Sequence, residues 1–154
     1  MKILIIEDDP NKAGQLMKFL EEELFSITIV LKKSYKSGLK ELLSDDYDLI
    51  LLDMSMPTFD ITIEESGGKP LPFAGKEILR QMKRRNVTIP AIIVTQFESF
   101  GEAEKKITLD KLKNELNQEF LQIYIDTIYY NPAGSDWKKL LLNLILSIKG
   151  ITHD

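Results

Sequence analysis

The sequence predicts an α/β domain in which a parallel five-stranded sheet is covered by helices on both faces. Two observations support this fold class: short apolar runs alternate with segments of helical period, and three of those runs are apolar at every position. Uninterrupted apolar strands are typical of a sheet that is buried on both sides. The expected arrangement is doubly wound, with the strands in the order 2-1-3-4-5.

The first half of the chain contains two predicted strand-helix repeats and a third strand. Residues 3–6 are a continuous apolar run, and Ala13, Leu16 and Leu20 recur afterwards at helical spacing. Pro10 suits the first turn of that helix, where a backbone N–H has no intrahelical partner. We therefore expect strands at residues 3–6, 26–31 and 49–52, and helices at residues 10–24 and 34–43.

The second half of the chain continues this alternation. A helix at residues 76–85 and a fourth apolar strand at residues 91–94 come first. Apolar stripes then predict helices over residues 109–120 and 137–148, and we attribute these stripes to core packing rather than to ligand binding. Between them, residues 122–130 alternate in the way typical of an edge strand with one partly exposed face.

Composition limits the possible classes of function. The length of 154 residues suits one core, so we expect a single domain over residues 1–154. A net charge of -4 leaves no broad cationic surface for nucleic acid or for an anionic membrane. Cysteine is absent and the one histidine is His153, which argues against disulfides, thiolate metal sites and histidine-based triads. The apolar start of the chain is too short for a signal peptide or a membrane span, so a cytoplasmic protein is expected.

Acidic side chains follow two of the predicted strands at the points where those strands end. Glu7, Asp8 and Asp9 come after the first strand, Asp53 ends the third, and Thr95 ends the fourth. Parallel strands end at one edge of a sheet, so Asp8 and Asp53 converge if their strands are neighbours. Converging carboxylates need a counter-charge, and a hard cation such as Mg²⁺ leaves room for phosphate oxygens. The alternative is that the acids only cap the first helix, which fits Asp9 better than it fits Asp8 with Asp53.

Three segments together resemble a known protein family. Residues 3–10, 48–57 and 91–95 look like the first, third and fourth strands of the receiver domain of two-component response regulators. The acidic pair, the aspartate followed four residues later by a proline, and the threonine occur in the family's order. The resemblance extends over residues 1–149 and implies a flavodoxin-like fold and a signalling role, and we do not expect the protein to be an enzyme.

The resemblance also implies a role for each residue at this edge of the sheet. Asp53 would accept the phosphoryl group, and Asp8 would bind Mg²⁺ directly, with Glu7 as a ligand directly or through water. The backbone carbonyl of Ser55 would be a further ligand, and the Thr95 hydroxyl would bond the phosphoryl group and move with it. A histidine kinase or phosphotransfer protein would be the donor, and a downstream protein would receive the signal. No nucleic-acid or membrane partner is expected.

The chain departs from the family pattern most clearly before Pro132. Asn131 stands there in place of a lysine whose ammonium contacts the acceptor and then the phosphate. An amide donates hydrogen bonds but brings no positive charge. Gln96 replaces a small residue after the threonine, and Ile128 replaces an aromatic residue.

Two segments are longer than the family pattern. The family's glycine after the Met-Pro pair has its counterpart at Gly75, so residues 58–74 are mostly an insertion. A second insertion is expected near residues 97–108. Both follow strands at the edge where ligands bind in such sheets.

Three hypotheses about function remain open at this point. The first is a receiver that is phosphorylated on Asp53 and signals through a partner protein. The second is a pseudo-receiver, a binding module that works without phosphorylation, which the missing lysine favours. The third is a Mg²⁺-dependent nuclease of the topoisomerase-primase type. It fits poorly, because Ser55 stands where a second acid is needed and the acidic protein offers no surface for DNA.

Overall fold

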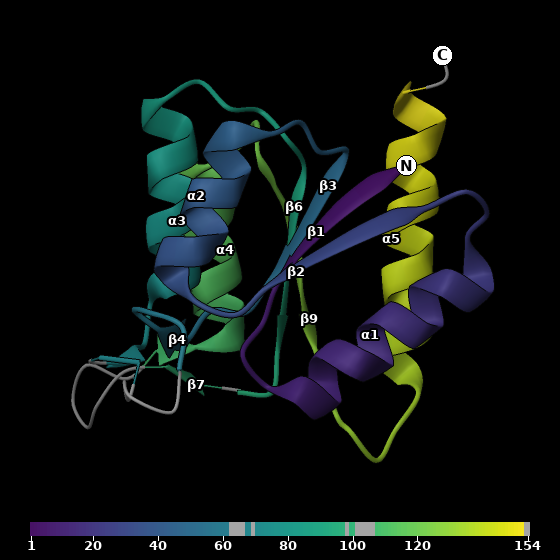
Figure 1. Ribbon diagram of the computed structural model, residues 1–154, viewed down its shortest axis with the longest axis horizontal. Coiled ribbons are helices and arrows are strands. Elements are labelled where there is room, and N and C mark those ends of the chain that lie inside the picture. The colour runs from purple at the N-terminus through teal and green to yellow at the C-terminus, as the bar shows by residue number, and fades with distance from the viewer. Residues whose placement is uncertain (62–66, 69, 98, 101–106, 153–154) are drawn as a thin grey trace.

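A five-stranded parallel sheet forms the centre of the computed structural model, which describes residues 1–61, 67–68, 70–97, 99–100 and 107–152 (Figure 1). Its strands are β1 (Lys2–Ile6), β2 (Thr28–Lys32), β3 (Leu49–Leu52), β6 (Ala91–Thr95) and β9 (Tyr124–Tyr129). They lie in the order β2-β1-β3-β6-β9. The predicted order 2-1-3-4-5 is therefore confirmed.

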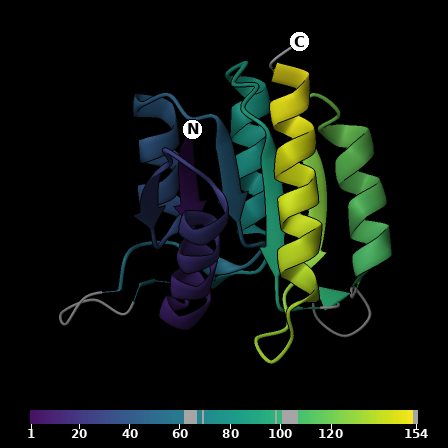
Figure 2. The same cartoon turned by 90° about the vertical axis from the view of Figure 1, so that its right-hand side faces the viewer.

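Helices cover both faces of the sheet. α1 (Pro10–Glu23) and α5 (Asp136–Thr152) lie on one face, which is turned toward the viewer in Figure 2. α2 (Tyr35–Ser44), α3 (Ala74–Arg84) and α4 (Leu109–Glu119) lie on the other. The doubly wound arrangement is confirmed. Within the described ranges, no helix combines the length and the apolar character that crossing a bilayer requires.

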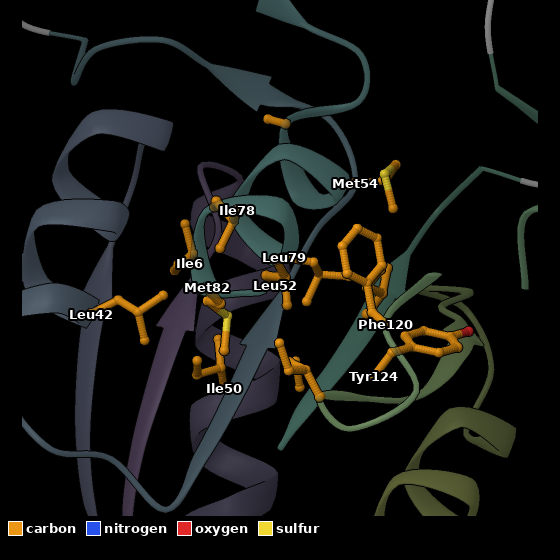
Figure 3. Packing of buried hydrophobic residues seen from close by; sticks show 14 of the residues in the cluster. Ile6, Leu42, Ile50, Leu52, Met54, Ile78, Leu79, Met82, Phe120 and Tyr124 are labelled. Atoms are coloured by element: carbon orange, nitrogen blue, oxygen red, sulfur yellow. The ribbon is translucent and has the colours of Figure 1, made fainter. Parts of the chain in front are cut away.

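The central strands are buried because both of their faces are apolar. Ile3, Leu4, Ile5 and Ile6 have no exposed surface, and alternate side chains point to opposite faces. Leu4 and Ile6 pack with the helices α2, α3 and α4, whereas Ile3 and Ile5 pack with α1 and α5. Figure 3 shows the first of these cores, in which Leu42 of α2 approaches the strands beside side chains of α3. Burial of each such side chain contributes on the order of 2 kcal/mol.

Two strands begin two residues later than the sequence predicts. β2 begins at Thr28 rather than at residue 26, because Ser26 has a φ of 54° and the chain is still turning there. β9 begins at Tyr124 rather than at residue 122, because the amides of Ile123 and Tyr124 both donate to the Phe120 carbonyl in a turn after α4. Neither shift changes which residues reach the carboxyl edge of the sheet.

Short strand pairs accompany both predicted insertions. β4 (Met56–Pro57) pairs with β5 (Pro70–Leu71), and β7 (Ser99–Phe100) pairs with β8 (Ile107–Thr108), both antiparallel. Figure 1 places both pairs at the edge where the parallel strands end. Residues 62–66, 69, 98, 101–106 and 153–154 lie outside the described residues, and with them parts of both insertions and His153. The single domain over residues 1–154 and the extent of each insertion therefore stay predictions.

Candidate functional site

Three carboxylates gather where β1 and β3 end. Ile6 of β1 pairs with Leu52 of β3, so the residues that follow, Glu7 and Asp53, leave the sheet next to each other. Glu7, Asp8 and Asp53 each place a carboxylate oxygen within 4.8 Å of the other two. The predicted convergence of Asp8 and Asp53 is confirmed.

The three carboxylates differ in exposure and in their hydrogen bonds. Glu7 and Asp53 are buried, with 3% and 6% of their surface exposed, whereas Asp8 is exposed. The backbone N–H of Met54 donates to Asp53 Oδ1 at 2.7 Å, and that of Asp9 donates to Glu7 Oε2 at 3.1 Å. Each buried carboxylate therefore has one oxygen held by the backbone and a second oxygen that faces other groups.

Burial changes the acidity of this group. Desolvation raises the pKa of Glu7 to about 7; the nearby ammonium of Lys12 opposes the rise and the charge of Asp53 adds to it. Burial also raises the pKa of Asp8 above its ordinary value, and the charge of Asp53 again adds to the rise. Negative charge is therefore costly at this edge of the sheet, and a cation relieves that cost.

A buried lysine lies among the carboxylates. Lys12 has no exposed surface, and its Nζ lies 2.5 Å from Glu7 Oε1 and 3.1 Å from Asp53 Oδ2. The same ammonium donates to the Val94 carbonyl oxygen at 2.5 Å and lies 5.9 Å from the centre of the Tyr130 ring. Its N–H donors thus have the partners that a buried ammonium requires.

Lys12 is not among the residues predicted for the site, although the sequence contains a signal for it. Lys12 stands four residues before Leu16 and eight before Leu20, on the stripe by which α1 packs against the sheet. A lysine on a buried stripe is rare unless it is paired. Because Lys12 lies about one helical turn after the acidic residues 7–9, those residues are its expected partners.

The start of α1 determines where Lys12 lies. Asp9 is the N-cap, and its Oδ1 accepts the backbone N–H groups of Asn11 and Lys12 at 2.9 and 3.3 Å. Gln96 Nε2 donates to Asp9 Oδ2 at 3.1 Å, which joins α1 to the end of β6. Desolvation raises the pKa of Asp9, but the hydrogen bonds from Lys12, Gln96 and Asn11 outweigh it and leave this pKa below its ordinary value. The capping role expected for Asp9 is confirmed.

Thr95 and Asn131 follow the two remaining strand ends. Thr95 is buried, and its Oγ1 accepts the backbone N–H of Phe97 at 3.2 Å. Asn131 is exposed, and its Oδ1 accepts the backbone N–H of Ala133 at 3.0 Å, which closes a turn between β9 and α5. Among the described hydrogen bonds, none joins the Asn131 side chain to the acidic group. The positive charge near the acceptor comes from Lys12 instead.

A cavity of about 370 Å³ opens beside the exposed carboxylate. Asp8, Ser55, Gln96, Ile61 and Phe97 are among the residues that line it. Ser55 thus lies beside Asp8, while the metal-binding role of its carbonyl stays a prediction. Ile61 and Phe97, which are 65% and 51% exposed, belong to the two predicted insertions. Those segments therefore contribute apolar side chains to the rim of the site.

Gly75 allows α3 to approach the loop that carries Asp53. Its N–H donates to the Met54 carbonyl at 2.9 Å, and a Cβ atom on Gly75 would lie 2.6 Å from the Asp53 carbonyl oxygen. A larger residue would push α3 and this loop apart. The close approach fits the assignment of Gly75 as the counterpart of the family's glycine.

The donor set at this edge fits a hard divalent cation. Such ions prefer carboxylate and carbonyl oxygens, and Glu7, Asp8 and Asp53 provide three carboxylates in one cluster. Asp8 faces the cavity, from which a solvated ion has access. Lys12 already contacts one oxygen each of Glu7 and Asp53, so an added cation would share this pair with the ammonium.

Comparisons with known proteins agree with this geometry. Residues 3–113 match the family model described as the response regulator receiver domain. The chain is 33% identical over 150 residues to the Detocs response regulatory protein DtcB of Enterobacter cloacae, an alignment that covers 96% of this chain and 100% of that protein. It is 32% identical over 151 residues to the uncharacterized protein y4jR of Sinorhizobium fredii, covering 96% of this chain and 99% of that protein.

Solved structures share the fold. A two-component response regulator from Clostridium difficile has a TM-score of 0.63 at 22% identity, with 100% of this chain and 99% of that chain covered. The response regulator protein TrrA from Thermotoga maritima, solved in complex with Mg²⁺-BeF, has a TM-score of 0.59 at 20% identity, with 93% and 97% covered. At these identities the likeness concerns the fold alone. The family match, however, includes the strand ends that carry Glu7, Asp53 and Thr95, and it shows that this chain belongs to the response regulator receiver domain family.

Proposed function

We propose that the protein receives a phosphoryl group on Asp53 from a phosphohistidine and signals through a partner protein. One observation carries the proposal: Asp53 is a buried carboxylate at a strand end, and Oδ2 faces an ammonium while two further carboxylates lie within 4.8 Å. The charge of Asp53 raises the pKa of Glu7 and of Asp8, so the cluster has no evident structural use. A phosphoryl-accepting site gives it one.

The chemistry requires a donor on a separate protein, a histidine kinase or phosphotransfer protein. The bond between phosphorus and the donor's imidazole nitrogen breaks, and a bond forms between phosphorus and a carboxylate oxygen of Asp53. The departing imidazole takes up a proton from water. The backbone N–H of Met54 holds the Asp53 carboxylate in place by donating to its Oδ1. We propose that the protein is a cytoplasmic signalling domain. It is not an enzyme in this proposal, because the phosphoryl group that it receives stays attached to Asp53.

Mg²⁺ is the proposed cofactor. Glu7, Asp8 and Asp53 and the backbone carbonyl of Ser55 would hold it, and the ion would neutralise charge on the phosphoryl oxygens. The cavity beside Asp8 leaves room for bound water and for phosphate oxygens.

Thr95 is the proposed link to the partner protein. Its hydroxyl oxygen accepts the Phe97 N–H, so a side-chain rotation that turns this hydroxyl toward a phosphoryl oxygen would move it away from Phe97 and release the loop after β6. Phosphorylation would then shift the population of two conformers of that loop. The exposed Phe97 side chain changes position with it.

A second function, the pseudo-receiver, is favoured by one observation. Lys12 neutralises part of the acidic group through its contacts with Glu7 and Asp53. A site balanced in this way needs no phosphoryl group to be stable, and the protein would then act as a constitutive binding module.

Intact-mass measurement separates the two functions. We expect wild type, incubated with Mg²⁺ and acetyl phosphate or phosphoramidate, to gain the mass of one phosphoryl group. Asp53→Asn should gain none, because it lacks the nucleophilic oxygen. Asp46→Asn is the matched control, since Asp46 is an exposed aspartate remote from the acidic group, and it should behave as wild type. Wild type that stays unmodified with both donors would favour the pseudo-receiver.

A further inference from the structure

We propose that Lys12 is the residue that supplies positive charge to the phosphoryl group on Asp53, a task that the residue before Pro132 does not perform in this chain. The inference rests on the proposed function. It assigns the charge to the first turn of α1 rather than to the turn between β9 and α5 that contains Asn131.

The contacts of Lys12 place its ammonium at the acceptor. Nζ lies 3.1 Å from Asp53 Oδ2, the carboxylate oxygen that the Met54 N–H leaves free. It is also 2.5 Å from Glu7 Oε1 and donates to the Val94 carbonyl at 2.5 Å. The Val94 carbonyl immediately precedes Thr95, so the ammonium spans from the acceptor to the strand end that carries the hydroxyl.

Lys12 is held in this position from both ends. At the backbone, the Asp9 cap accepts the Lys12 N–H, and Gln96 ties that cap to β6. At the far end, the ring of Tyr130 lies 5.9 Å from the ammonium. The charge is thus preorganised, which is the condition for strong electrostatic stabilisation in a buried site.

Phosphorylation gives this ammonium a new acceptor. When Asp53 becomes an acyl phosphate, its carboxylate charge is lost and the phosphoryl oxygens carry the negative charge. The Lys12 donor that faces Oδ2 is the one able to follow that charge, because the lysine side chain has four flexible bonds and three N–H donors. The contact with Val94 keeps the ammonium at the end of β6 as this happens.

The competing role is that of a fixed counter-ion, which neutralises Glu7 and Asp53 and takes no part in phosphoryl transfer. The two roles predict different responses to Lys12→Met, a variant of similar length without charge. A fixed counter-ion competes with Mg²⁺, so its removal only tightens Mg²⁺ binding. If the ammonium binds the phosphoryl group, its removal also slows the transfer, even when Mg²⁺ is saturating.

The experiment measures phosphorylation by acetyl phosphate at saturating Mg²⁺ by intact mass, with Mg²⁺ affinity determined separately by calorimetry. We expect Lys12→Met to lower the rate on the order of 100-fold. Lys12→Met combined with Asn131→Lys should recover about tenfold of that loss, because the charge returns from the β9 side. Lys18→Met is the control on the exposed face of the same helix, and it should match wild type.

A second readout does not depend on transfer. In wild type with Mg²⁺ and beryllofluoride, a phosphoryl mimic, the ¹⁵N signal of the Lys12 ammonium should shift while that of Lys18 stays in place. If Lys12→Met does not fold, the double variant Glu7→Gln, Lys12→Met takes its place, because it removes the ammonium together with one of its charge partners. Its phosphorylation rate is then compared with that of Glu7→Gln alone.

The outcomes separate this inference from the function on which it rests. Lys12→Met that is phosphorylated as fast as wild type, or an unshifted Lys12 signal with beryllofluoride bound, overturns the role of Lys12 and leaves the receiver function standing. Wild type that takes up no phosphate overturns both. A slower Lys12→Met with recovery by Asn131→Lys supports the inference.

Discussion

The β1-α1 junction and the β9-α5 junction lie at the same edge of the sheet. The first contributes a buried charged side chain to the acidic group, whereas the second forms an exposed turn. At the first, the Asp9 cap starts α1 at Pro10, and Lys12 enters the acidic group from the first turn. At the second, Asn131 closes an exposed turn with Ala133. A charge required at one point of a fold can therefore come from another element, provided that the helix carrying it begins at the right residue.

The largest expected effect is the loss of stability in Lys12→Met. Removing one partner of a buried charge group leaves Glu7 and Asp53 uncompensated, so the free energy of unfolding in Mg²⁺-free buffer should fall by about 3 kcal/mol. Lys18→Met should stay within about 0.5 kcal/mol of wild type, because Lys18 is exposed. Urea unfolding measures both. Equal stability of the two variants would show that the β1-α1 junction does not depend on this charge.

The next effect is a pH dependence confined to the β1-α1 junction. The pKa of Glu7 is raised from 4.5 to about 7, so within this window the folded protein binds more protons at Glu7 than the unfolded chain does. Stability contributed by the protonated form is therefore lost as pH rises through the window, by about 1 to 3 kcal/mol relative to Glu7→Gln.

Urea unfolding of wild type and Glu7→Gln across this range, without Mg²⁺, measures the difference. Asn131→Ala should keep the wild-type pH profile, because Asn131 makes no described contact with Glu7. A constant difference between wild type and Glu7→Gln at every pH would contradict the raised pKa of Glu7.

The smallest expected effects separate the two turns themselves. Asp9→Ala should cost about 1 kcal/mol through the lost cap, and Asn131→Ala about 0.5 kcal/mol through one exposed hydrogen bond. Ser34→Ala removes the N-cap of α2 and is the matched control for the cap alone. Of the three, only Asp9→Ala should also slow phosphorylation, because only that cap positions Lys12. If Ser34→Ala slows it equally, the effect is one of general stability.

The fold could be predicted from the sequence because it depends on local patterns. Continuous apolar strands and helical stripes identify the buried elements directly. The limits of β2 could not be predicted in the same way. They depend on the left-handed backbone at Ser26, a conformation that serine rarely adopts.

The site was predictable only where the backbone alone places a residue. Glu7, Asp8 and Asp53 follow strand ends, so parallel topology is enough to bring them together. The position of Lys12 depends on where α1 begins and on which way a long side chain turns from it. The orientation of Asn131 depends on a turn that its own side chain forms. The buried stripe of α1 indicates that Lys12 faces the sheet, but the atoms that its ammonium reaches, like the turn at Asn131, are consequences of three-dimensional packing.

The aromatic residues next to Lys12 give the protein an intrinsic fluorescent probe of this site. Trp137 is the single tryptophan of the chain, and its buried indole lies 5.1 Å from the ring of Tyr130 and 5.4 Å from that of Phe19, centre to centre. The ring of Tyr130 is in turn the one beside which the Lys12 ammonium lies. A displacement of that ammonium changes the electric field around the tyrosine and the indole, so intrinsic fluorescence should register the charge state of the acceptor without any attached dye.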